Sequence, residues 1–183
     1  FTLAFARAIG EYGSVIFIAG NIPFVSEIAP LLIVIRLEEF NYAGATTVAA
    51  VMLVVSFALL LALGLLSVAV ATPFILIQWN LKRLLAYSSI EHVGIMAVGV
   101  GLGAEAATFG ALLHMTYHTL AKPLAFFSAG TLAQLHASSD FDEIGPGTLG
   151  RTPVASVLFV LAAVIMTGSP PFGLFWSEMT ILK

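Results

Sequence analysis

The sequence predicts an all-α, polytopic transmembrane helical bundle with about five or six spans, because runs of roughly 20 apolar residues recur along the chain. Of its 183 residues, 60% are hydrophobic and 9% are charged. An average soluble domain has about 25% charged residues. The mean hydropathy of +1.04 agrees with a chain that is largely surrounded by lipid. The lipid bilayer is therefore the first partner that we expect.

Composition also excludes several classes of function. The formal net charge is −3, so no basic surface is available for nucleic acid. The absence of cysteine excludes disulfides, thiolate zinc sites and Cys-ligated iron–sulfur clusters. Nucleotide-binding loops, a serine-nucleophile elbow and a His-Glu-x-x-His zinc motif are missing from the sequence too. We therefore expect no cofactor, no metal site and no catalysis by this chain alone.

The first expected span, residues 1–20, carries Arg7 and Glu11 one helical turn apart. Their mutual neutralisation explains how one apolar helix can contain both, although an arginine on a solute pathway could instead meet an anion. A turn at Asn21-Ile22-Pro23 ends this helix. Residues 28–35 are apolar but too short to span, which favours an interfacial or re-entrant piece. The chain opens on Phe with no charged leader region, so it reads as an internal fragment.

The stretch from residue 40 to residue 81 is anomalous. It contains no charged residue over about 42 positions, which as a helix would extend roughly 63 Å, about twice the bilayer core. Two separate spans would need a polar loop between them. Gly64 and Pro73 are the only obvious breaks that the sequence offers.

The remaining segments follow a regular rhythm. Lys82-Arg83 marks a membrane boundary that the positive-inside tendency places in the cytoplasm. Further spans are expected at residues 84–103, 106–135 and 153–168, with a long polar connection over 136–152. The sequence Ser169-Pro170-Pro171-Phe172-Gly173 cannot continue a helix, so we predict a broken helix near residues 169–173.

Three ionisable residues of the 106–135 segment, His114, His118 and Lys122, are spaced four residues apart. This spacing places them on one face of a helix, where neighbouring groups or waters can pass a proton. Histidine suits such a relay because it exchanges protons near neutral pH. Structural roles are the alternative: the histidines would bond neighbouring helices, and the lysine would pair with an acid. Three such groups on one stripe favour ion translocation, because charge within a membrane needs a partner, water or a function.

Other ionisable residues are weaker candidates. Glu178 follows the predicted break, where an ion would be handled, unless the break is a loop at the membrane surface. Glu91 and His92 are adjacent, so they face different sides of a helix and cannot both line one path; one of them can line it while the other is structural. Lys82 alone fits a lysine that anchors a helix at the interface.

Three sequence motifs resemble a known family. The stretch from Leu81 to Gly94, which reads LKRLLAYSSIEHVG, is followed by HMTYHTLAK from His114 and by GSPPFGLFWSE from Gly168. Together they resemble the antiporter-like membrane subunits of respiratory complex I, and the Glu-His variant is most similar to the subunit of formate-hydrogenlyase-type hydrogenases. The resemblance covers residues 64–183.

The resemblance implies a membrane subunit that moves protons or cations, beside other subunits of a hydrogenase or complex I-type membrane arm that carry the redox chemistry. It assigns the ion path to His114, His118, Lys122 and Glu178, with Lys82 as a further motif residue. The family also uses a glutamate and a lysine on earlier helices, which this sequence does not contain. The implied location is the inner membrane of a bacterium or archaeon.

Residues 1–63 carry a second resemblance. The segments FTLAFARAIGEYGSV, IAGNIP, EIAPLL and YAGAT resemble the C-terminal end of a sulfate/thiosulfate ABC-transporter permease. That family implies an ABC ATPase and a second permease subunit as alternative partners. A junction near residues 62–66 would fuse two spans without a loop, which accounts for the overlong apolar run. We therefore predict two parts, residues 1–63 and 64–183, with a sulfate permease fragment and a non-functional fusion as alternative functions.

Overall fold

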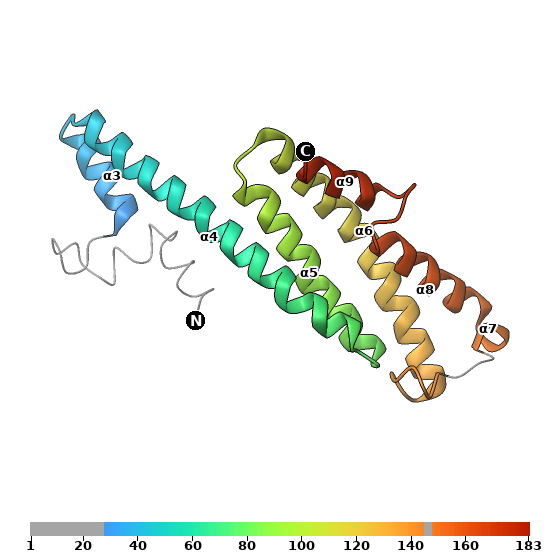
Figure 1. The fold of residues 1–183 in the computed structure, drawn as a ribbon. Coiled ribbons are helices and arrows are strands. Elements are labelled where there is room, and N and C mark those ends of the chain that lie inside the picture. Colours follow the sequence, from blue (N-terminus) through green and yellow to red (C-terminus); the bar gives the residue numbers. More distant parts are fainter. Residues whose placement is uncertain (1–27, 145–147) are drawn as a thin grey trace. The chain divides into compact units, whose positions relative to one another are not determined.

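The computed structural model describes residues 28–144 and 148–183, and within these ranges it is helical with no β-strand, as predicted (Figure 1). Arg7, Glu11 and the expected span over residues 1–20 lie outside the described residues. The helices of the described part are α3 (Ala29–Glu38), α4 (Tyr42–Leu76), α5 (Leu81–Gly101), α6 (Glu105–His136), α7 (Thr148–Arg151), α8 (Pro153–Met166) and α9 (Gly173–Ile181). The chain divides into two compact units, Phe1–Ser56 and Phe57–Lys183, and α4 runs from the first into the second.

The uncharged stretch forms one continuous helix, α4, of 35 residues. At about 1.5 Å per residue it is roughly 52 Å long, which exceeds the bilayer core. Gly64 and Pro73, the only obvious breaks that the sequence offers, both lie inside α4 and do not interrupt it. Gly64 serves helix packing instead: a Cβ there would lie 2.7 Å from the Gly94 carbonyl oxygen of α5.

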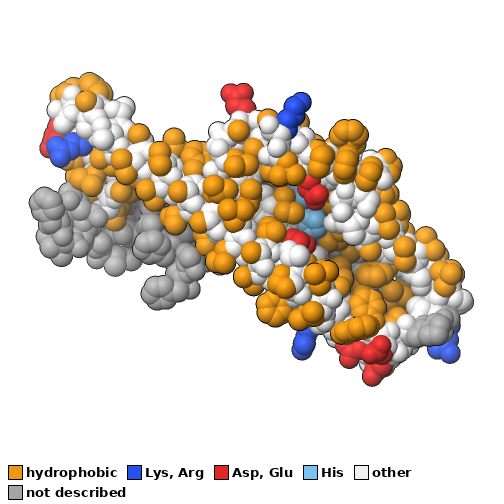
Figure 2. Space-filling model, in the orientation of Figure 1, with side chains coloured by type: hydrophobic (Ala, Val, Ile, Leu, Met, Phe, Trp, Pro, Cys, Tyr) orange, Lys and Arg blue, Asp and Glu red, His pale blue; other side chains and the backbone are white. Residues whose placement is uncertain are grey.

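Two of the described helices, α4 and α5, are long and apolar enough to cross a membrane by length and composition. The count of five or six spans therefore stays a prediction. Large hydrophobic side chains cover most of the face shown in Figure 2, and charged side chains are few. On α4, for example, Val54 is 66% exposed and Leu66 is 60% exposed, as expected of residues that face lipid rather than water.

In the second unit, α6 packs against α5, α8 and α9 (Figure 1). Its buried face is made largely of small residues that recur every three or four positions, and such stripes let helix backbones approach closely. These residues are Ala107, Gly110, Ala111, Ala121, Ala125, Ala129 and Ala133. The same stripe contains His114 and Lys122, so packing of α6 carries its ionisable residues into the interior.

The predicted broken helix is confirmed. The α8 helix ends at Met166, residues 167–172 are not helical, and α9 begins at Gly173. Because α9 is packed against α6, the break returns the chain to the ionisable face of that helix.

Candidate functional site

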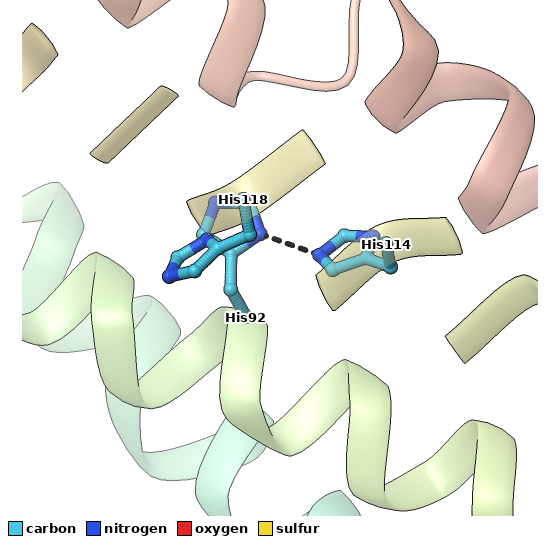
Figure 3. A group of neighbouring side chains, drawn as sticks. All are labelled: His92, His114 and His118. Atoms are coloured by element: carbon cyan, nitrogen blue, oxygen red, sulfur yellow. Dashed lines mark hydrogen bonds between the residues drawn. The ribbon is translucent and has the colours of Figure 1, made fainter. Parts of the chain in front are cut away.

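Three histidines from two helices meet in the second unit. His92 comes from α5, and His114 and His118 come from α6, one turn apart (Figure 3). The His92 ring lies 5.1 Å from that of His114 and 4.7 Å from that of His118, measured between ring centroids. One nitrogen from each ring lies within 4.8 Å of the others. His92 therefore bridges the two histidines of α6.

A directed chain of hydrogen bonds fixes His114. The Ser177 hydroxyl donates to the carbonyl oxygen of Leu174 at 2.7 Å, so its oxygen is free to accept from His114 Nδ1, 2.9 Å away. With its proton on Nδ1, His114 presents a bare Nε2, which accepts from His92 Nδ1 at 2.9 Å. We assign these tautomers from the hydrogen-bond pattern. His114 and Ser177 have no exposed surface, so lipid and bulk water do not reach the hydrogen bond between them.

The other end of the histidine group leads to Lys122. Its Nζ donates to the carbonyl oxygen of Leu85, 2.7 Å away, and to the hydroxyl of Ser88, both on α5. His118 stands one turn earlier on the same face, and its Nδ1 is buried without a hydrogen-bond partner among the described residues. The predicted stripe is thus present: all three α6 residues, His114, His118 and Lys122, face α5.

Gly110 explains why Ser177 reaches His114. A Cβ at Gly110 would lie 2.9 Å from the backbone nitrogen of Ile181 and 3.0 Å from the Ser177 carbonyl oxygen. Only glycine permits this close crossing of α9 over α6. Since Gly110 lies one turn before His114, the crossing delivers the Ser177 hydroxyl directly to the imidazole.

Glu91 and His92 face different helices, as predicted from their adjacency. The Glu91 carboxylate accepts a hydrogen bond from Thr72 of α4 at 2.9 Å, whereas His92 faces α6. Glu91 is nevertheless close enough to interact electrostatically with Lys122 and with Glu178. Glu91 therefore places an acidic side chain near Lys122 and the histidines.

Glu178 lies on α9, six residues after the end of the non-helical segment. Its carboxylate sits against Gly168, where a Cβ would lie only 2.6 Å from Oε2. Together with residues of α4 and α5 it lines a pocket of about 450 Å³. The other lining residues are apolar: Leu65, Val68, Ala69, Ile95, Val98, Ile181 and Leu182.

Lys82 is not brought into this group. It is exposed on the first turn of α5, about 15 Å along the helix axis from His92. This position agrees with an interfacial anchor.

The sequence does not point to Ser177 and does not decide the role of His92. Ser177 was not singled out, although it directly precedes Glu178 in the motif after the break. For His92 the sequence leaves a structural role and a place on the ion path both open, because adjacency to Glu91 does not reveal which neighbour each side chain faces. Both are positioned by contacts between helices, which spacing along one helix cannot predict.

Replacing Ser177 by Ala should lower the free energy of unfolding by about 1–3 kcal/mol, because the buried Nδ1 of His114 loses its partner. Thr180→Ala is the matched control on α9, since the Thr180 hydroxyl bonds only to Trp176 of its own helix among the described residues. Denaturant unfolding followed by helical circular dichroism measures both variants. Equal stability of the two variants would contradict the hydrogen-bond assignment.

Comparison with known proteins identifies the family. Residues 14–183 match the family described as NADH:quinone oxidoreductase/Mrp antiporter, TM. The match begins well before residue 64, where we predicted that the antiporter-like part starts. No solved structure matches the chain.

Individual relatives are of two kinds. The chain is 38% identical to a hydrogenase-4 component F homolog of Methylacidiphilum infernorum, over 68% of this chain and 26% of that protein. It is 29% identical to formate hydrogenlyase subunit 3 of Escherichia coli, over 68% of this chain and 22% of that protein. Over 34% of the chain it is 56% identical to the probable sulfate transport system permease protein cysT of Nephroselmis olivacea, of which it covers 22%.

The chain therefore spans about a quarter of the length of these relatives. The family match, by contrast, covers nearly the whole chain. This chain belongs to the NADH:quinone oxidoreductase/Mrp antiporter family of transmembrane proteins, and it is an integral membrane protein.

Proposed function

We propose that this chain is a proton-translocating part of a hydrogenase or complex I-type membrane arm in the inner membrane of a bacterium or archaeon. The observation that carries the proposal is the row formed by Lys122, His118, His92 and His114, in which His118 is partly buried and the other three side chains are buried. Neighbouring members of the row lie on facing helices or one turn apart, and histidine accepts and releases protons at physiological pH. The name of the hydrogenase-4 relative supports this assembly.

The geometry suggests an order for proton transfer that includes His92 of α5 beside the three residues of α6. We infer that a proton moves between Lys122 and His118, then through His92 to Nε2 of His114. Ser177 holds His114 in the tautomer that faces His92, so it is a positioning residue. Glu178, the next residue on α9, is the acidic exchange point at the end of the row. Other subunits of the arm carry the redox chemistry.

The test is proton flux into vesicles that contain the full chain, driven by a potassium diffusion potential and reported by an internal pH-sensitive dye. We expect the chain to conduct protons and His118→Ala to reduce the flux at least about tenfold, because removing a proton-transfer group is costly. His136→Ala is the control, since His136 bonds instead to the carbonyl oxygen of Leu132 at the end of α6. Flux equal to that of protein-free vesicles, or equal loss in both variants, would overturn the proposal.

We also propose that residues 1–63 form a separate, permease-derived part joined to the antiporter-like part over 64–183. The permease relatives support this organisation, since one of them is 56% identical over only 62 residues. The division into compact units at Ser56 agrees with a change near this point. Sulfate uptake with an ABC ATPase and a second permease subunit is the corresponding alternative function.

Long-read sequencing of the source DNA across the codons for residues 60–67 tests the two-part proposal. We expect the permease-like and antiporter-like parts to lie in separate genes. Reads that carry one uninterrupted gene through these codons would contradict this. Sulfate uptake that persists after residues 1–63 are deleted would eliminate the permease alternative.

A further inference from the structure

We propose that His92, His114 and His118 together bind one divalent transition-metal ion of the zinc type, and that the bound ion blocks the proton row. The sequence alone predicts no metal site, because it does not bring His92 to the other two histidines. The block depends on the function proposed above, whereas binding of the ion does not.

The distances suit such an ion. Zn²⁺ binds imidazole nitrogen at about 2.0–2.1 Å in tetrahedral geometry, which places two ligating nitrogens about 3.3 Å apart. In the structure, His92 Nδ1 and His114 Nε2 are 2.9 Å apart, and one nitrogen from each of the three rings lies within 4.8 Å of the others. Small ring rotations, which change the separations between nitrogens by a few tenths of an ångström to about 1.5 Å, would bring all three nitrogens to the spacing of tetrahedral ligands. The fourth position is left for water.

The donor set selects the class of ion. Three neutral imidazoles suit zinc, copper and nickel, whereas magnesium and calcium require oxygen ligands. His118 has a buried Nδ1 with no partner in the described part of the chain, which is the kind of group that a ligand satisfies. Metal binding requires a bare nitrogen on each ring, and the Ser177 hydroxyl already directs the proton of His114 to Nδ1 and leaves Nε2 bare.

Of the three histidines, His118 lies nearest the surface, so we infer that an ion would approach past its ring. His92 and His114 are buried, but His118 is only partly so. Figure 2 shows histidine at the base of a hollow with acidic side chains on both sides. Negative charge beside such an opening attracts cations.

Metal and proton would compete for the same atoms. The lone pair of His114 Nε2 that accepts the hydrogen bond from His92 is the one that would bind the ion. His92 would bind through Nδ1 with its own proton moved to Nε2, so no proton could then pass between the two rings. A bound ion would thus stop transfer at the bridge between α5 and α6.

Zinc binding is measured on the full chain in lipid nanodiscs by equilibrium dialysis with metal analysis, and the geometry of the site by the visible absorption of Co²⁺. We expect one Zn²⁺ per chain and a four-coordinate Co²⁺ spectrum. His118→Ala should weaken zinc binding at least about 100-fold, and Ser177→Ala about 10- to 100-fold. His136→Ala, which removes the remaining one of the four histidines, should bind as the wild type does.

His118 is only partly buried, which favours folding of its variant, and circular dichroism checks this. Absence of stoichiometric zinc in the wild type, or equal affinity in His118→Ala and His136→Ala, would overturn the metal site. Proton flux measured in the same preparations separates the two proposals. Zinc binding without any proton flux leaves the metal site standing and removes the proposed function, whereas flux unchanged at saturating zinc overturns the block.

Discussion

Replacing Lys122 by Met should reduce proton flux to the level of protein-free vesicles. Met has a similar length but cannot carry a proton, so the row would end at His118. The variant should still fold, because the Leu85 carbonyl oxygen that Lys122 contacts also accepts from the hydroxyls of Ser88 and Ser89 at 3.1 and 3.0 Å. Dye-reported flux under an imposed potential measures the effect.

Lys82→Met is the matched control for this substitution. Lys82 is exposed on the first turn of α5 and stands apart from the row, so its loss should leave the flux unchanged. Flux in Lys122→Met equal to that of the wild type would remove Lys122 from the path. Equal losses in both lysine variants would show that charge in general, rather than position in the row, determines the flux.

Gly110→Ala should lower the free energy of unfolding by about 1–3 kcal/mol, since the added Cβ would press against the backbone of α9 at Ile181 and Ser177. It should also weaken the Ser177–His114 hydrogen bond and the flux that depends on it. Gly130→Ala on the same helix is the control, because a Cβ there meets nothing within 4 Å. That substitution should stabilise α6 by up to about 1 kcal/mol.

Denaturant titration of the two glycine variants in the same lipid gives the comparison directly. We expect the change in the free energy of unfolding to have opposite signs in Gly110→Ala and Gly130→Ala. Destabilisation of both by the same amount would mean that the close crossing of α9 at Gly110 has no special cost, and the explanation of how Ser177 reaches His114 would fail.

Features that depend on one helix could be predicted from the sequence. The four-residue spacing placed His114, His118 and Lys122 on one face, and the Pro-Pro-containing segment broke the helix where expected. Both follow from local backbone geometry.

Features that depend on contacts between helices could not be predicted in this way. The sequence offers Gly64 as a possible break in the long apolar run, whereas in the structure it is a contact point for α5 inside a continuous helix. His92 enters the row only because α5 is packed against α6, and Ser177 enters only because α9 crosses at Gly110. Helix periodicity states which side chains share a face and not which neighbour that face meets.

The claim on which the proposed function and the proposed metal site both depend is that His92 of α5 is hydrogen-bonded to His114 of α6, with the His118 ring beside them. With only four histidines in the chain, ¹⁵N-histidine labelling gives a spectrum simple enough to test it in lipid. We predict a ¹⁵N–¹⁵N coupling across the hydrogen bond between His92 Nδ1 and His114 Nε2, and none involving His136. Absence of that coupling, with His92 and His114 titrating independently of each other, would contradict the row.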